Sequence, residues 1–426
     1  MLFQAQSLIG LLLIPLLAWM LSEARSAIRP ARLLRIVLAG LGLQFAIAGV
    51  MLNVAAVRVG FDWAAGLVTA LQAATTAGMR LVFGYLAGGP APFAVVRPEN
   101  SFVLAFNALP LMLVVSALSR LLYHWGVLQQ VVRAFAWMLQ RSTGVSGPVG
   151  TSAAANIFVG MIEAPLFIRP YLADMSRAGL FATMTVGMAG VAGTVLAVYA
   201  AILEPTLAGA AGHLMVASVI SAPAGLMLAA LMVPDRVTQA EPRGAAEMTM
   251  PDAAHSSMDA IAQGTREGIA LLANVTAMLV VIVALVALAN QLLGFLAEPL
   301  GLKLTIEGVL GVMFAPLAWL AGIPWSECPK AGALLGVKTV LNEFVAYLQL
   351  AATGPEALSG RSRLILTYAL CGFANFGSLG IMIGGIAAMV PARRAEIVSL
   401  GAKTLISGTL ATLMTGAVVG VMTPGS

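Results

Sequence analysis

The sequence predicts an all-α polytopic membrane protein. Hydrophobic residues make up 60% of the 426 residues, whereas charged residues make up only 10%. A soluble domain carries roughly 25% charged residues, so a chain this poor in charge cannot cover a water-facing surface. Apolar runs of about 20 residues, the length that crosses a bilayer, recur along the chain. These observations exclude a soluble enzyme and a nucleic-acid-binding protein.

The first two apolar runs, residues 2–21 and 36–57, are predicted membrane-spanning helices. The turn between them contains four arginines: Arg25, Arg29, Arg32 and Arg35. Short loops rich in Lys and Arg stay in the cytoplasm. We therefore expect the N-terminus to lie outside the cell. Residues 1–60 form the predicted N-terminal scaffold helices.

The next segment, residues 61–101, is predicted to contain an interfacial helix and a loop. Its polar residues recur at helical spacing on an otherwise apolar helix, as at Thr69, Gln72, Thr76 and Arg80. Such a stripe suits a helix that lies at the membrane surface or packs against protein. A hydrophilic loop, residues 234–268, then separates two halves, residues 102–233 and 269–426. Further spans are expected at residues 102–125, 179–203, 214–233, 271–296, 365–389 and 400–422.

Two segments are too polar to face lipid and too apolar to be soluble loops. They are residues 144–165 and 331–352, which contain Glu163 and Glu343. A carboxylate in the hydrocarbon region costs at least about 2.5 kcal/mol, so it must face a cavity or a partner. Irregular backbone at membrane depth is tolerated only where protein buries it or where it lines a cavity. Both segments are therefore predicted to be re-entrant helical hairpins.

The two halves look like copies of each other. The sequence NIFVG at residues 156–160 corresponds to NEFVA at residues 342–346. Each is followed by a glycine-interrupted helix, GMAGVAG at residues 187–193 and GFANFGSLG at residues 372–380. Paired hairpins and broken helices are typical of transporters built from structural repeats, with the substrate near the bilayer midplane. The prediction is about eight transmembrane helices, two hairpins and two broken helices.

Three motifs carry a family resemblance. EAPLFIRPYL (residues 163–172), LNEFVAYL (341–348) and GFANFGSLG (372–380) resemble the concentrative nucleoside transporter family, and the likeness extends over residues 102–420. The resemblance implies a bacterial inner-membrane homotrimer, surrounded by lipid, in which a transport domain moves against a scaffold as an elevator. It also implies ion-coupled import of nucleosides, with no cofactor.

The resemblance assigns ribose binding to the NEF and FANFGS motifs. The corresponding residues are Glu343, Asn375 and Ser378, which suit vicinal hydroxyls because they combine a carboxylate with neutral donors and acceptors. An ion pair with Lys338 is the alternative role for Glu343. Helix capping is the alternative for Asn375 and Ser378. Phe373 either offers an aromatic face to the substrate or packs within the protein.

On the base-binding side the sequence departs from the family pattern. The usual Gly-Gln-Thr/Ser-Glu is replaced by Gly160-Met161-Ile162-Glu163, so two hydrogen-bonding residues become apolar. Each unmade hydrogen bond costs about 1–3 kcal/mol. We therefore expect a purine or modified nucleoside, with a nucleobase or another nucleoside-like metabolite as the alternative. Glu163 is retained, and Val195 matches an apolar wall position of the family pocket.

The expected coupling ion is a proton, with sodium as the alternative. The family's sodium site corresponds here to Asn156, Val159, Gly190 and Val191, and Gly190 stands where a Ser or Thr hydroxyl is expected. A hard cation needs full oxygen coordination, which the loss of this ligand weakens. Glu163 and Glu343 are the protonatable candidates for coupling.

Two other function classes are alternatives for a chain of this composition. An intramembrane enzyme would need a nucleophile–base pair or clustered metal ligands, and the sequence has neither. Its two cysteines, Cys328 and Cys371, lie far apart and form no CxxC pair. A passive channel or substrate sensor on a transporter fold is the other alternative, and counterflow would expose it because a channel cannot accelerate exchange.

Overall fold

The computed structural model describes residues 2–27, 30–96, 103–234, 254–297, 299 and 304–423. Within these ranges the regular structure is helical and contains no strand. Six of the described helical segments are long and apolar enough to cross a membrane, and three shorter apolar helices accompany them. The predicted fold class, an all-α polytopic membrane protein, is confirmed. Arg29 and most of the hydrophilic loop, residues 235–253, lie outside the described residues.

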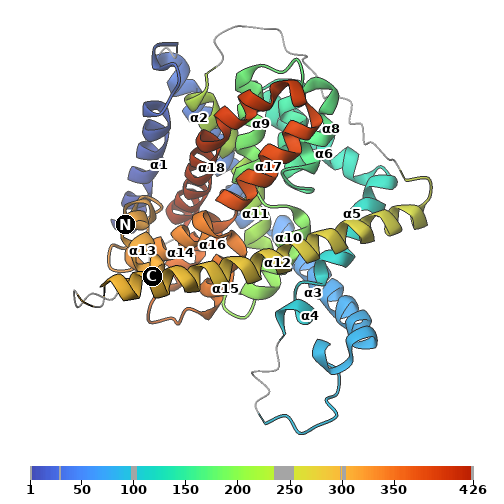
Figure 1. Ribbon diagram of the computed structural model, residues 1–426. Coiled ribbons are helices and arrows are strands. Elements are labelled where there is room, and N and C mark those ends of the chain that lie inside the picture. Colours follow the sequence, from blue (N-terminus) through green and yellow to red (C-terminus); the bar gives the residue numbers. More distant parts are fainter. Residues whose placement is uncertain are drawn as a thin grey trace.

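Among its described residues the first half contains eleven α-helices, which Figure 1 shows in blue to green. They are α1 (Leu2–Met20), α2 (Pro30–Asn53), α3 (Ala55–Phe83), α4 (Leu104–Asn107), α5 (Leu111–His124), α6 (Val127–Thr143), α7 (Gly147–Asn156), α8 (Glu163–Phe167), α9 (Arg177–Ala189), α10 (Gly193–Leu203) and α11 (Ala210–Met232).

In the part of the second half that the structure describes, seven further α-helices follow. They are α12 (Ser257–Ala297), α13 (Ile306–Leu320), α14 (Cys328–Val340), α15 (Glu343–Ala352), α16 (Gly360–Leu370), α17 (Phe376–Met389) and α18 (Arg394–Met422). The order of elements repeats between the halves. A helical hairpin (α7–α8 or α14–α15) is followed by a broken helix (α9–α10 or α16–α17) and then by one long helix (α11 or α18). The predicted pairs of hairpins and broken helices are both present.

The core lies along the two long helices. α11 and α18 are buried along most of their length, whereas the apolar surface of α12 is exposed, as at Val280, Leu288 and Phe295. A helix that is apolar all round is stable inside a protein or against lipid. α12 packs beside α5 and crosses the front of the molecule in Figure 1. The α5–α12 pair therefore forms a structural unit distinct from the hairpins and broken helices.

Three helix assignments extend or correct the sequence-based prediction. α12 starts at Ser257, inside the stretch predicted as a loop, because Ser256 and Asp259 cap it. The Ser256 hydroxyl accepts from the Asp259 amide at 3.1 Å, and the Asp259 carboxylate accepts from the His255 amide at 2.9 Å. Helices α6 and α13 were not assigned from the sequence. α13 is only 15 residues long, which falls short of a full bilayer span.

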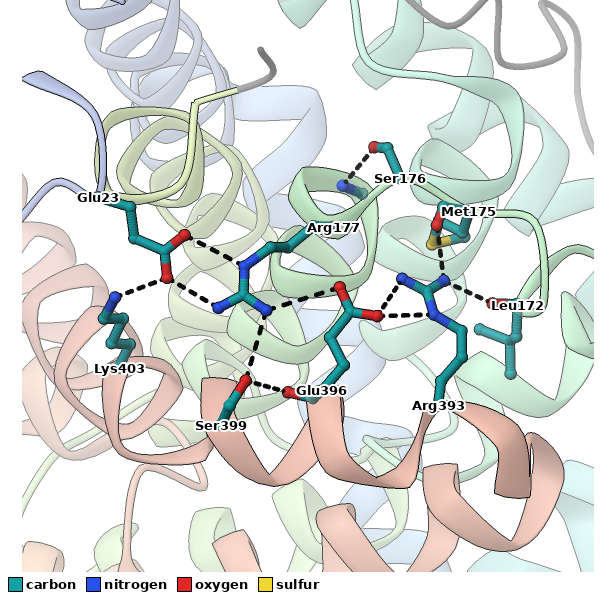
Figure 2. Close-up of polar contacts among 10 residues, drawn as sticks. Glu23, Leu172, Met175, Ser176, Arg177, Arg393, Glu396, Ser399 and Lys403 are labelled. Carbon is teal, nitrogen blue, oxygen red and sulfur yellow. Dashed lines mark hydrogen bonds and ion pairs between the residues drawn. The ribbon is translucent and has the colours of Figure 1, made fainter. Parts of the chain in front are cut away.

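Charged residues join one end of several helices (Figure 2). Glu23, in the α1–α2 connection, accepts from Arg177 Nε at 3.1 Å and from Lys403 Nζ at 2.6 Å. Arg393 donates to Glu396 at 2.7 Å and to the carbonyl oxygen of Leu172 at 2.8 Å. The hydrogen bond from Arg177, together with that from Lys403, outweighs burial and lowers the pKa of Glu23 to about 2. This cluster fixes the starts of α9 and α18 against the α1–α2 connection.

Candidate functional site

The irregular segments of the two halves meet inside the molecule. These are the first hairpin turn (residues 157–162), the first helix break (190–192) and the second helix break (371–375). The Gly193 amide donates to the Phe158 carbonyl oxygen at 3.0 Å, and the Phe373 amide donates to the Gly190 carbonyl oxygen at 3.1 Å. A helix break leaves N–H and C=O groups without partners inside the helix, and in a site away from water these groups need other hydrogen-bond partners. Here the breaks satisfy each other, which holds the site together.

Two glycines permit this close approach of backbones. A Cβ atom added at Gly193 would lie 2.7 Å from the Phe158 carbonyl oxygen. One added at Gly372 would lie 2.8 Å from the Ala189 carbonyl oxygen and 2.5 Å from Thr412 Cγ2. Real Cβ atoms do not come so near, so a residue with a side chain would push the segments apart.

The predicted ribose-binding residues lie together at the start of α15 and α17. Glu343 is buried, and its carboxylate accepts from Asn375 Nδ2 at 2.9 Å. Asn375 also caps α17, since its Oδ1 accepts from the Ser378 amide at 2.7 Å. Asn375 therefore contacts Glu343 and caps the helix at once. Ser378 and Phe373 are half-buried beside it.

Lys338 has partners other than Glu343. Its Nζ donates to the Ala369 carbonyl oxygen at 2.9 Å and to Thr412 Oγ1 at 2.7 Å. The ion pairs found among the described residues do not include Lys338 with Glu343. Glu343 is thus held by neutral donors.

Tyr199 on α10 is a site residue that the sequence analysis did not identify. Its hydroxyl donates to Glu343 at 2.6 Å, and its ring contacts Phe344 and Tyr347 with centroids 5.9 and 4.9 Å away. It follows Val195 by four positions, which places both on one face of α10. That spacing from a predicted pocket residue is the signal that could have found it.

Residues of the first hairpin turn point in different directions. Met161 packs against Gly187, where an added Cβ would lie 3.2 Å from Met161 Cβ, and Ile162 packs in the same way against Gly385. Val195 is buried, whereas Glu163 is exposed. The structure therefore brings Met161 and Ile162 against α9 and α17, and leaves Glu163 accessible.

The Glu163 side chain lines a pocket between the hairpin and the α5–α12 pair. Val159 of the same hairpin and Thr194 of α10 line this pocket with Glu163, and Arg120, Tyr123 and Glu267 line its other side. Arg120 Nε donates to both carboxylate oxygens of Glu267, at 2.9 and 3.0 Å. The sequence analysis did not single out Arg120, although a lone charge within a predicted span is itself a functional signal.

Two of the predicted ion-coupling residues, Asn156 and Gly190, lie close together. Asn156 Nδ2 donates to the Val186 carbonyl oxygen at 2.9 Å, whereas its buried Oδ1 has no hydrogen-bond partner within the described ranges. A Cβ added at Gly190 would lie 2.8 Å from Asn156 Nδ2 and 3.6 Å from Ser221 Oγ. Val191 is buried and Val159 is half-buried.

Three family models match the chain. The model described as "Na+ dependent nucleoside transporter N-terminus" matches residues 9–86, and the one described as "Nucleoside recognition" matches residues 105–206. The model described as "Na+ dependent nucleoside transporter C-terminus" matches residues 213–420. The chain belongs to the concentrative nucleoside transporter family. It is therefore a secondary active nucleoside transporter of this family and not an enzyme.

Several relatives of this transporter match over almost their whole length. An uncharacterized transporter from Haemophilus influenzae is 37% identical over 97% of both chains. Nucleoside permease NupC from Helicobacter pylori is 36% identical over 97% of both chains. The transporter CNTnw, solved in an inward-facing substrate-bound state, superimposes with a TM-score of 0.87 at 35% identity and covers 98% of this chain and 97% of its own. The protein is accordingly a multi-pass bacterial membrane protein.

Proposed function

We propose that this transporter imports purine or modified nucleosides and couples their import to protons. The observation that carries the nucleoside assignment is the cluster of Glu343, Asn375 and Ser378 at two helix starts. A carboxylate accepts from two vicinal hydroxyls, and the amide and the serine hydroxyl supply further donors and acceptors. This pattern suits a ribose.

The apolar turn of the first hairpin supports a purine or modified base. Met161 and Ile162 pack against glycines of α9 and α17. Because both side chains are apolar, they offer the base no hydrogen-bonding group. Uracil would then lose hydrogen bonds worth about 1–3 kcal/mol each. A nucleobase or another nucleoside-like metabolite is the alternative cargo, since it depends less on the ribose cluster.

Proton coupling is supported by the surroundings of Gly190. The Asn156 amide nitrogen, a donor, occupies the space next to the position where the family places a hydroxyl ligand. A sodium ion wants oxygen ligands on all sides. The residues present fit such a site only in part, so Glu163 and Glu343 are the groups we propose to carry the proton.

Sodium coupling is the second candidate. Two observations favour it, namely the Oδ1 of Asn156, which has no hydrogen-bond partner among the described residues, and the nearby hydroxyl of Ser221. These oxygens, with the Val159 carbonyl, offer a cation some of its ligands. Gly190→Ser should then strengthen any dependence of nucleoside binding on sodium.

Thermal-shift measurements of the purified protein test the proposal. A panel of nucleosides and nucleobases is screened in sodium and in potassium at two pH values. We expect stabilisation by purine nucleosides that changes with pH and not with sodium. Glu343→Gln and Ser378→Ala should abolish it. The ribose assignment would be refuted if no nucleoside raised the melting temperature while nucleobases did.

Met161→Gln combined with Ile162→Thr tests how the base is bound. The double variant should bind uridine more tightly than the wild type does. Unchanged uridine binding would mean that this turn does not contact the base.

The homotrimer, the elevator movement and the external N-terminus remain proposals for this chain. The exposed apolar surface of α12 and its packing against α5 support a scaffold against which the hairpins move. Mass measurement of the protein in detergent and labelling of a cysteine placed at residue 2 in intact cells would test subunit number and orientation. Counterflow in proteoliposomes separates a carrier from a channel.

A further inference from the structure

The pocket next to the first hairpin contains charged residues that the proposed function does not use. Arg120 on α5 and Glu267 on α12 line it opposite Glu163. The Arg120 side chain is 15% exposed and that of Glu267 is 51% exposed. An arginine within an apolar helix is costly, and apolar residues would stabilise the α5–α12 contact at least as well as an ion pair. The position of the pair in a pocket therefore points to binding.

Glu267 fixes the orientation of the arginine. Arg120 Nε lies 2.9 and 3.0 Å from the two oxygens of Glu267, and Nη2 donates to the same carboxylate. A guanidinium held in this way is a planar group that only donates hydrogen bonds. Glu163, on the facing hairpin, supplies an acceptor. The pocket thus contains a guanidinium donor from α5 and a carboxylate acceptor from the hairpin.

An aromatic surface lies beside these two walls. Tyr123, three residues after Arg120, lines the same pocket and stacks on Phe167 with ring centroids 5.5 Å apart and an interplanar angle of 10°. A fixed aromatic ring offers a planar base a surface for offset stacking. The pocket therefore combines a stacking surface, a fixed donor and an acceptor.

We propose that Arg120 and Glu163 bind the edge of a 6-oxopurine, so that inosine and guanosine are preferred over adenosine. This inference rests on the proposed function and names its substrate class. In a 6-oxopurine, O6 and N7 are adjacent acceptors that an arginine contacts together. The neighbouring N1–H, and the 2-amino group of guanosine, donate to a carboxylate. Adenosine instead presents an amino group at position 6, which would face the donors of Arg120.

Binding calorimetry on the purified full-length transporter tests this inference. Inosine, guanosine, adenosine and uridine are titrated into the wild type, Arg120→Met and the control Arg133→Met. Arg133 is exposed on α6 and does not line the pocket. We expect the wild type to bind inosine at least about tenfold more tightly than adenosine, which is the discrimination typical of a bidentate arginine contact.

The variants separate binding from a structural role. Arg120→Met should weaken inosine binding about tenfold and leave adenosine within about twofold, which removes the preference. Arg133→Met should change neither. If Arg120→Met does not fold, Arg120→Lys, which keeps the charge without the planar fork, should reduce the preference instead.

The outcomes also separate this inference from the proposed function. Equal wild-type affinity for inosine and adenosine would overturn it while leaving nucleoside transport intact. Equal weakening of all four nucleosides by Arg120→Met would assign Arg120 a structural role. A wild type that binds none of the four would refute the proposed function itself.

Discussion

Replacing Gly372 by alanine tests whether the contact between the helix breaks stabilises the transporter. The added Cβ would lie 2.8 Å from the Ala189 carbonyl oxygen and 3.0 Å from that of Met188. Both are backbone atoms, which cannot turn aside as a flexible side chain could. The first break would have to move away from the second, and the bond from the Phe373 amide to the Gly190 carbonyl oxygen would lengthen.

The expected magnitude follows from overpacking. Forcing an extra methyl group into a filled interior costs about 1–3 kcal/mol. By the scaling of mid-sized domains this lowers Tm by roughly 2–12 °C. Nucleoside binding should weaken as well, since Phe373 and Asn375 lie in the displaced segment.

Gly380→Ala is the matched control. Gly380 is exposed within α17, and no atom of the described residues lies within 4 Å of its added Cβ. Alanine in a helix interior is favoured over glycine by roughly 0.5–1 kcal/mol. We therefore expect Gly380→Ala to keep or raise Tm in the same fluorescence-monitored melt. The reasoning is refuted if Gly372→Ala melts at or above Gly380→Ala.

Two further predictions concern Tyr199 and Glu23. Tyr199→Phe removes a 2.6 Å hydrogen bond to buried Glu343. Tm should therefore fall by an amount corresponding to about 1–3 kcal/mol, and calorimetry should show weaker nucleoside binding. An unchanged Tm together with unchanged nucleoside affinity would show that this hydrogen bond stabilises neither the fold nor the bound state. Because the folded-state pKa of Glu23 is lowered from 4.5 to about 2, its stabilising contribution is full above pH 4.5 and declines as the pH falls toward 2. The Tm of Glu23→Gln should therefore lie below that of the wild type at pH 7 and approach it in acid, and a gap that stays constant with pH would contradict this.

Much of the architecture could be predicted because its causes are local in the chain. Glycines inside apolar runs mark helix breaks, and carboxylates inside such runs mark sites that cannot face lipid. Glu343 was identified in this way and Asn375 from the family resemblance, and the structure places them in contact at 2.9 Å. The start of α12 was misplaced, because a polar helix that continues beyond the apolar stretch has the composition of a loop.

Hydropathy, glycines and buried carboxylates in the chain are enough to predict the membrane class, the repeated halves and the helix breaks. Which residues meet between the two halves becomes visible only in the folded protein. Tyr199 and Glu343 are 144 positions apart, and Arg120 and Glu267 are 147 apart. The physical reason is that hydropathy and backbone preferences act over a few residues. The partner of a polar side chain instead depends on how whole helices pack.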